Sequence, residues 1–440
     1  MTRPKQDPET KFNSIWPAAT TVAAFLFALA FTLAVSQSAP AQQFQVLYSF
    51  TGGSDGLHPS SGVIVGPDNA LYGSTGGGNC YENSGVSCGT IFRLDNTGSG
   101  WALTTLYSFR GGTDGSAPGA LKFGPDGKLY GTTFSGGKFQ YQCFYLGCGT
   151  VFSLTRDSDG TWSKTALYAF NGPPDAQTPV APVAFDAAGN LYGAASGGSY
   201  TCGEGYQCGA AYELVRSGGG WSENVIWNFD GTSWPPSNLV VGPEGDLYGT
   251  AFNGNMEDGP MGDPGVGVAF ELANTSAGWT QVFLHDFNLF AELGGGADPS
   301  GGLTLDSSGN LYGVTLYGGF NHTGSAFKLT PDGGGWNFQT LYSFQGTLNS
   351  GPYGTLVVDQ LGTLYGERYP DGTHSPSYGV VFKLTHSDAG WTYSVIHDFT
   401  GGADGKYLSG FLTLDAQGNL LGTTTEGGAY GNGVVFEITP

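Results

Sequence analysis

The sequence is poor in charge, and above all in positive charge. Only 12% of its 440 residues are charged, about half the usual share. It has 15 Lys plus Arg against 36 Asp plus Glu, which gives a formal net charge of −21. The basic residues form no cluster, so the positive surface with which proteins neutralise phosphates is missing. We therefore expect no nucleic-acid partner and no binding to anionic membrane surfaces.

The sequence also has little that favours long helices. Its 77 glycines and 23 prolines make up almost a quarter of the chain. The glycines do not follow the three-residue period of collagen, and aromatic residues at 14% argue against disorder. Glycine at this level is typical of many sharp turns between short strands.

The N-terminus has the order of a secretory signal peptide. Arg3, Lys5 and Lys11 precede an uncharged run over 18–35, and an Ala-Pro-Ala sequence ends at Ala41. An uncleaved membrane anchor is the alternative, because a run of about 18 residues is near the lower limit for a span. We expect a signal peptide at 1–41, one domain at 42–440, and a secreted or periplasmic protein without membrane attachment after cleavage.

One unit recurs seven times along the chain. The string LYG, or LLG in the last copy, begins at Leu71, Leu129, Leu191, Leu247, Leu311, Leu364 and Leu420. A G-x-x-F/Y string follows at Gly89, Gly149, Gly209, Gly267, Gly324, Gly379 and Gly433. LYSF and its variants begin at Leu47, Leu106, Leu167, Ile226, Leu284, Leu341 and Ile396.

Each unit contains four short apolar or alternating runs separated by turn residues. In the fifth unit these runs are 301–306, 311–315, 325–330 and 336–344. Repeated units of four strands are typical of propellers, in which radial repetition leaves only short sheet edges. We therefore predict an all-β fold, a seven-bladed β-propeller of four-stranded antiparallel blades.

The two ends of the chain predict how the ring closes. The mature chain begins with a fourth-strand run at 45–50 and ends with a third-strand run at 434–439. The N-terminal strand should therefore pair in the last blade. In the other copies a Trp lies five residues before the LYSF string, and here that position is Gln42, the first residue after the predicted cleavage.

The recurring segment LYSFxGGxDGxxPxxxLxxDxxGNLYGTTxxGGxxGxGxVFxL resembles the Gloeobacter/Verrucomicrobia-type tandem repeat, also called the GloVer repeat, of exported bacterial proteins. The resemblance covers residues 45–440. It implies a propeller-like repeat protein for which no activity and no catalytic residues are established. Many members end in a surface-anchoring segment, whereas this sequence ends at Thr439-Pro440, which favours release.

Strand direction predicts two different faces. The loops between second and third strands share one face, here called the loop face, with the links between blades. From the Gly of LYG to the Gly that opens the third strand, these loops span 16, 18, 16, 18, 11, 13 and 11 positions from blade one to blade seven. The enlarged loops of blades one to four are where we expect binding. The other face carries uniform Asp-containing turns that we interpret as structural.

Three of the enlarged loops carry all six cysteines. Pairing within each loop is favoured over the other arrangements of six cysteines. A metal site is the weaker alternative, because the spacings lack the C-x-x-C pattern and an exported chain favours oxidation. The predicted disulfides are Cys80–Cys88, Cys143–Cys148 and Cys202–Cys208.

The same loops carry aromatic residues, which suit a glycan or a protein partner. Packing of these rings over their own disulfides is the alternative. The candidate binding residues are Tyr81, Tyr141, Tyr145, Tyr200 and Tyr206.

The links between blades repeat an acidic position, five residues after the Phe of LYSF. It holds Asp55, Asp114, Asp175 and Asp404. A ring of carboxylates could bind calcium or a polar ligand. The alternative, which we favour, is a turn that each blade reuses.

Support for catalysis is thin. No G-x-x-x-x-G-K and no H-E-x-x-H motif occurs. His58, His322 and His374 fall on the loop face, where with a carboxylate they could act as acid and base or hold a metal. We predict a monomeric, exported, non-catalytic propeller that binds a ligand or partner through blades one to four. It has no cofactor unless calcium binds. The alternative is a metal-assisted lyase or hydrolase with its site on the same face.

Overall fold

The structure is a computed structural model of the chain. It describes Met1 and residues 42–77, 88–138, 143, 146–198, 201–202, 206–229, 238–252, 267–287, 295–347, 350–370 and 377–440, with the backbone alone at 201–202 and 206–207. Gln43–Pro440 form one compact unit. The one helical segment in the described part is the short 3-10 helix η1 (Gly112–Asp114). No described helix has the length and apolar character needed to cross a bilayer.

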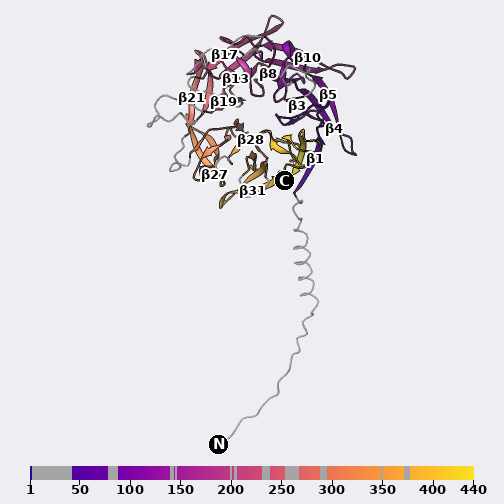
Figure 1. Cartoon of the computed structure of the whole chain (residues 1–440). Helices are drawn as coiled ribbons and strands as arrows, with labels where there is room; N and C mark the ends of the chain where they lie inside the picture. Colours follow the sequence, from indigo (N-terminus) through magenta and orange to yellow (C-terminus); the bar gives the residue numbers. More distant parts are fainter. Residues whose placement is uncertain are drawn as a thin grey trace. The chain divides into compact units, whose positions relative to one another are not determined.

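The fold is a seven-bladed propeller of small antiparallel sheets (Figure 1). Blade one contains β2 (Val63–Val65), β3 (Leu71–Thr75), β4 (Thr90–Asn96) and β5 (Trp101–Ser108). Blade two contains β6 (Ser116–Pro118), β7 (Lys122–Phe123), β8 (Leu129–Ser135), β9 (Thr150–Arg156) and β10 (Trp162–Ala169). Blade three contains β11 (Gln177–Pro179), β12 (Ala184–Phe185), β13 (Leu191–Gly197), β16 (Ala210–Ser217) and β17 (Gly220–Asn228). Blade four contains β18 (Val240–Val241), β19 (Leu247–Ala251), β20 (Val268–Thr275) and β21 (Gly278–Asp286).

The remaining blades follow the same order. Blade five contains β23 (Thr304–Leu305), β24 (Leu311–Thr315), β26 (Ser325–Asp332) and β27 (Gly335–Ser343). Blade six contains β28 (Pro352–Val358), β29 (Leu364–Arg368), β30 (Val380–Ser387) and β31 (Gly390–Asp398). Blade seven contains β32 (Lys406–Leu408), β33 (Thr413–Leu414), β34 (Leu420–Glu426), β35 (Val434–Thr439) and β1 (Gln43–Ser49). Two small pairs lie outside these sheets, β14 (Thr201–Cys202) with β15 (Tyr206–Gln207) and β22 (Gly296–Ala297) with β25 (Tyr317–Gly318).

The ring closes as the sequence predicts. Strand β1 pairs antiparallel with β35, from Gln43 opposite Thr439 to Ser49 opposite Val434. Figure 1 shows β1 beside the C-terminal strands. Strand β1, the first in the described part of the chain, thus completes the sheet formed by β32, β33, β34 and β35.

The glycine of each LYG string is required by a ring in the neighbouring strand. A Cβ on Gly73 would lie 2.4 Å from Phe92 Cζ, far inside contact distance. The same close approach occurs in the last blade, where a Cβ on Gly422 would lie 2.4 Å from Phe436 Cζ. The LYG and G-x-x-F strings therefore recur together because they form one packing unit.

Aromatic pairs join each blade to the next. Phe50 of blade seven lies 5.2 Å from Phe92 of blade one between ring centroids, and the Phe of each LYSF string repeats this contact. The other six pairs, at 4.9 to 5.2 Å, are Phe109–Phe152, Phe170–Tyr212, Phe229–Phe270, Phe287–Phe327, Phe344–Phe382 and Phe399–Phe436. Such pairs are worth about 0.5–1.5 kcal/mol each beyond their buried area. Ring closure is thus one of seven equivalent junctions.

The innermost strands are shorter than the sequence suggests. The run 301–306 forms only β23, Thr304–Leu305. The first part of this run is bonded to the preceding blade instead. The Thr250 hydroxyl of blade four donates a hydrogen bond to the Gly301 carbonyl at 2.7 Å. Ser74 makes the corresponding bond to Gly119, at 2.8 Å. Contacts between blades therefore replace part of the ladder within the blade.

Candidate functional site

In the part of the loop face that the structure describes, a loop is joined to a link. In blade one the Gly76 N–H donates to the His58 carbonyl, which joins a second-to-third-strand loop to a link. The His58 N–H donates to the Asn432 carbonyl of blade seven. The loop face is therefore formed by loops and links together, as the strand directions predict.

The structure contains the disulfide Cys143–Cys148, with 5.1 Å between the Cα atoms. Cys88 and Cys208 are also disulfide-bonded. Their predicted partners lie outside the description, Cys80 entirely and Cys202 in its side chain. The candidate residues Tyr81, Tyr141, Tyr145 and Tyr200, and the side chain of Tyr206, also lie outside the described residues.

The repeated aspartates of the links close turns. Asp55 Oδ2 accepts hydrogen bonds from the Thr51 N–H at 2.7 Å and from the Tyr48 hydroxyl at 3.0 Å. Burial opposes ionisation of Asp55, but the bond that the Thr51 hydroxyl donates to Oδ1, at 2.6 Å, together with these two outweighs it and lowers the pKa of the carboxyl. Corresponding bonds hold Asp114 and Asp175, and Asp404 accepts from the Thr400 N–H at 2.8 Å. This geometry agrees with the turn interpretation.

The third residue of each outermost strand, counted from its Trp position, packs against the preceding blade. In blade five Phe338 stacks on His285 with 3.6 Å between ring centroids, and in blade seven Phe44 stacks on His397 at 3.7 Å. Both histidines are therefore packed against neighbouring rings. At this position blade two has Lys164 and blade three has Glu223.

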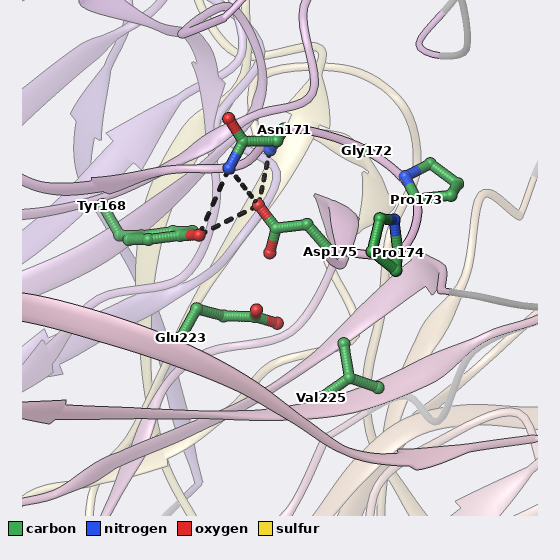
Figure 2. Close-up of a pocket in the computed structure, with 8 residues that line it drawn as sticks. All are labelled: Tyr168, Asn171, Gly172, Pro173, Pro174, Asp175, Glu223 and Val225. Atoms are coloured by element: carbon green, nitrogen blue, oxygen red, sulfur yellow. Dashed lines mark hydrogen bonds between the residues drawn. The ribbon is translucent and has the colours of Figure 1, made fainter.

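Blades two and three carry side chains of opposite charge at this position. Lys164 Nζ lies 2.8 Å from Asp114 Oδ1, and only 5% of the Lys164 side chain is exposed. In blade three, Glu223 of β17 faces Asp175 (Figure 2). The position that forms a buried ion pair in one blade thus brings two carboxyl groups together in the next.

The two carboxyl groups line a pocket of about 510 Å³ between the outer strands of blades two and three. Figure 2 shows the Asp175 and Glu223 side chains converging in it. The lining residues are Tyr168, Asn171, Gly172, Pro173, Pro174, Asp175, Glu223 and Val225.

The two oxygens of Asp175 have different surroundings. Oδ2 accepts from the Asn171 N–H and Nδ2, both at 2.7 Å, and from the Tyr168 hydroxyl at 3.0 Å. Oδ1 is buried and receives no hydrogen bond from a described N–H or hydroxyl group. It points toward the Glu223 carboxyl group, which is hydrogen-bonded to Asp175 (Figure 2).

Burial raises the pKa of Glu223 to about 9, and the hydrogen bond and charge of Asp175 add to the shift. At neutral pH Glu223 therefore carries a proton. This proton avoids the repulsion that two adjacent negative charges would have, and it lets Glu223 donate to Asp175.

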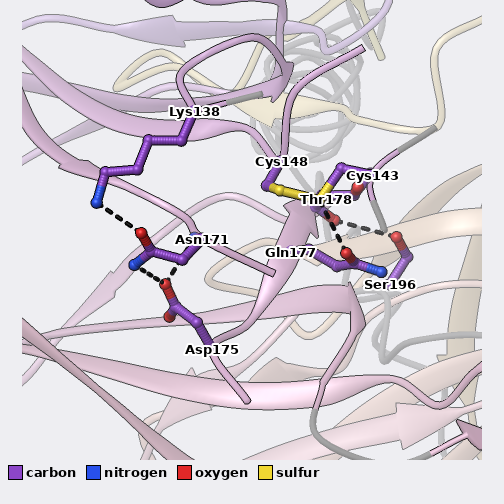
Figure 3. Close-up of a disulfide and its surroundings, with 8 residues drawn as sticks. All are labelled: Lys138, Cys143, Cys148, Asn171, Asp175, Gln177, Thr178 and Ser196. Atoms are coloured by element: carbon purple, nitrogen blue, oxygen red, sulfur yellow. Dashed lines mark hydrogen bonds between the residues drawn. A yellow bond between two sulfur atoms is a disulfide. The ribbon is translucent and has the colours of Figure 1, made fainter. Parts of the chain in front are cut away.

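The disulfide loop of blade two supports this pocket (Figure 3). Lys138 Nζ donates to Asn171 Oδ1 at 2.6 Å, which turns the Asn171 amide nitrogen toward Asp175. Gly172 adopts a φ of 73°, and a Cβ there would lie 3.2 Å from Cys143 Sγ. The link that carries Asp175 is therefore packed directly against the disulfide.

Glu223, Tyr168 and Asn171 are not among the residues predicted from the sequence. The sequence does contain a signal that could have indicated Glu223. At the equivalent position the other six blades have residues that are not acidic, namely Leu103, Lys164, Gln281, Phe338, Tyr393 and Phe44. An acidic residue two positions after the Trp is therefore a departure from the repeat. The role of Glu223 depends on Asp175, which lies 48 positions earlier in the sequence and faces Glu223 only in the folded ring.

The predicted histidine cluster is not assembled in the part that the structure describes. His58 Nδ1 lies 2.8 Å from the Thr425 carbonyl of blade seven, whereas His322 belongs to the loop of blade five. His374 lies outside the described residues. Within residues that are described, no group of three or more His, Cys, Asp or Glu side chains is placed to hold a metal ion.

A second pocket, of about 460 Å³, lies at the innermost strands. It is lined mainly by apolar side chains such as Val63, Leu121, Val183 and Leu239, with Lys122 as its charged residue among those described. It therefore offers no acid–base pair, in contrast to the pocket at Asp175.

Solved structures similar to this chain are propellers. A catalytically inactive variant of virginiamycin B lyase from Staphylococcus aureus, with quinupristin, is 13% identical with a TM-score of 0.53, over 91% of this chain and 99% of that one. An ulvan lyase, a polysaccharide lyase, is 11% identical with a TM-score of 0.50, over 87% of this chain and 94% of that one. At this identity the likeness shows the fold alone.

A search of curated proteins gave no match. The family model of the Gloeobacter/Verrucomicrobia repeat matches residues 30–205 and 200–436. These two matches span nearly the whole propeller and confirm the resemblance seen in the repeated strings. The chain belongs to the Gloeobacter/Verrucomicrobia repeat family.

Proposed function

We propose that this protein is exported and acts as a non-catalytic scaffold that binds a ligand through the loop face of blades one to four. The pocket at Asp175 and Glu223 is its ligand site. The observation that carries the proposal is the pair of carboxyl groups, Asp175 and Glu223, that lines one pocket of about 510 Å³. Holding two carboxyl groups together away from water costs free energy, which a bound donor or cation would offset.

The surroundings of the pocket support binding. Its wall comes from regular strands and from a link packed on a disulfide, so the polar groups are held in place before a ligand arrives. Disulfides form and persist in oxidising compartments, which supports export through the predicted signal peptide at 1–41.

An enzyme remains the second candidate, and the same pair of residues favours it. Glu223, which carries a proton at neutral pH, can serve as a general acid beside a second carboxyl group. The predicted metal-assisted lyase or hydrolase would need ligands from outside the described residues. The carboxyl pair could act without a metal.

A binding screen with matched variants tests the proposal. The protein expressed from the full chain and recovered after export is screened on glycan arrays and with small polar ligands by thermal shift. Asp175→Asn should abolish binding, whereas Asp404→Asn, which changes the corresponding turn in blade seven, should not. Binding that survives Asp175→Asn would contradict this site, and turnover of a bound compound would favour the enzyme.

Export is tested separately by fractionation and N-terminal sequencing. We expect the protein outside the cytoplasm with Gln42 as its first residue. A full-length chain retained in the membrane would instead support the anchor interpretation.

A further inference from the structure

Blade two shows how this fold holds an ammonium group. Besides its contact with Asp114, Lys164 Nζ lies 5.4 Å from the ring centroid of Tyr107, 5.0 Å from that of Phe109 and 5.9 Å from that of Phe152. A carboxylate and three aromatic faces thus surround one buried cation. Both interactions favour an ammonium over a neutral group.

Blade three repeats these surroundings. Tyr168, Phe170 and Tyr212 take the places of the three rings of blade two. The centroids of Tyr168 and Phe170 lie 5.3 Å apart with an interplanar angle of 76°, and the equivalent pair in blade two has 5.1 Å and 76°. The centroids of Phe170 and Tyr212 lie 5.0 Å apart with an angle of 71°, and the equivalent pair in blade two has 5.2 Å and 66°. The aromatic arrangement is therefore nearly the same in both blades.

The carboxylate is also present, but the ammonium is not supplied by the chain. Asp175 takes the place of Asp114. Tyr168 and Asn171 bond only to its Oδ2, and on the other side the Glu223 carboxyl group is hydrogen-bonded to Asp175 where blade two has an ammonium. Glu223 stands where blade two has Lys164, with a shorter side chain of opposite charge. The pocket of about 510 Å³ lies beside this pair.

We propose that the pocket binds a ligand through a primary ammonium group, which pairs with the Asp175 and Glu223 carboxyl groups as Lys164 Nζ pairs with Asp114 in blade two. This inference rests on the proposed function, because it names the class of ligand for the same site. A pocket of this size has room for the body of a sugar-sized molecule beyond its ammonium group.

Calcium fits the described residues less well than an ammonium. Calcium takes six to eight oxygen ligands, whereas this pocket presents two carboxyl groups, and one oxygen of Asp175 is already bonded to three donors. An ammonium needs only a few acceptors, and the Tyr168 ring, which lines the pocket, adds to its binding.

Binding should be linked to proton release. The groups that face Glu223 are Asp175 of the link, Tyr168 of β10 and Tyr212 of β16, and Lys138 approaches the pocket through Asn171. When the pocket is empty, Glu223 holds a proton at neutral pH. A bound cation favours the ionised carboxylate, so the proton passes to the buffer and affinity should rise with pH.

Isothermal titration calorimetry of the exported protein tests this inference. The probe is n-butylammonium, the neutral control is n-butanol, and calcium chloride tests for a metal. We expect n-butylammonium to bind at least tenfold more tightly than n-butanol, and several-fold more tightly at pH 8 than at pH 6. The heat should depend on the ionisation enthalpy of the buffer, as proton release requires.

Two substitutions of Glu223 separate the ammonium site from the proton. Glu223→Lys supplies the ammonium from the chain itself, and it should weaken n-butylammonium binding at least tenfold without lowering the melting temperature. Glu223→Gln keeps the shape and removes the titrating group, so binding should persist and the buffer dependence should vanish. Asp55→Asn, in the link before blade one, is the matched control and should leave binding unchanged.

Equal binding of n-butanol, full binding by Glu223→Lys, or binding of calcium alone would overturn the inference. If n-butylammonium does not bind but a neutral ligand is lost with Asp175→Asn, the inference fails and the proposed function stands. If no ligand depends on Asp175, both fail.

Discussion

The Gly410 N–H donates a 2.5 Å hydrogen bond to Glu367 Oε2 across the junction of blades six and seven. Glu367 is only 2% exposed and lies in the second strand of its blade, where other blades have a small side chain such as Thr132 or Thr423. Burial raises the pKa of this carboxyl to about 8, although the bond from Gly410 opposes the shift. The junction therefore contains an acid that is neutral at pH 7.

The raised pKa of Glu367 predicts that the protein loses stability at alkaline pH. Between pH 4.5 and about 8 the unfolded chain releases the Glu367 proton while the folded protein keeps it, so the free energy of unfolding falls as pH rises. The expected loss from pH 5 to pH 9 is on the order of a few kcal/mol. Urea denaturation of the wild type and of Glu367→Gln at pH 5, 7 and 9 measures it.

Glu367→Gln should flatten this pH profile, and Glu223→Gln should flatten it further through the same linkage. Glu426, on the exposed end of β34, is the control, since Glu426→Gln should leave the profile above pH 5 unchanged. A wild-type stability that rises between pH 5 and pH 8 would contradict the predicted buried acids.

Arg368, the residue after Glu367, should be essential to the link before blade six. It is 1% exposed, and it donates to the Ser350 carbonyl at 2.7 Å and to the Gln345 carbonyl at 2.6 Å. Arg368→Met should cost about 2–4 kcal/mol, because both carbonyls lose their charged donor. Arg368→Lys should recover little, because a single ammonium does not reproduce the planar fork of guanidinium donors. Hydrogen exchange should increase at residues 345–352 in both variants, and unchanged exchange there would contradict this role.

The packing of Phe92 over Gly73 predicts that alanine is not tolerated in the LYG string. Gly73→Ala would place a Cβ 2.4 Å from Phe92 Cζ, so we expect a loss of about 1–3 kcal/mol. Gly335→Ala is the matched control, because a Cβ there meets nothing within 4 Å and its φ is not positive. Thermal denaturation should separate the two variants clearly, and equal melting temperatures would argue against this packing unit.

The disulfide Cys143–Cys148 should stabilise both the loop and the pocket. For so short a loop, the chain-entropy model gives about 2 kcal/mol. The double variant Cys143→Ser with Cys148→Ser should therefore melt at a lower temperature. It should also bind ligand more weakly, because Gly172 rests on these sulfur atoms. A lower melting temperature with unchanged ligand affinity would show that the disulfide stabilises the fold but does not support the site.

Much of the fold is predictable because the same pattern of strand and turn residues recurs in all seven units. The strands 311–315 and 434–439 have the predicted bounds in the structure. The innermost strand of blade five is shorter than predicted, because the carbonyl of Gly301 bonds to Thr250 of blade four. Local sequence shows which residues alternate, but not which carbonyls the next blade will use.

The sequence alone determined the number of blades, the closure by the N-terminal strand and the face that carries the enlarged loops. These follow from periodicity, since each unit repeats the same strands and turns. Only the tertiary structure decided that Glu223 meets Asp175, because their contact depends on how the outer strand of one blade packs against the link from the blade before it. That blade three has Glu where blade two has Lys is visible in the sequence, but the pairing of this Glu with Asp175 in a pocket exists only in the folded ring.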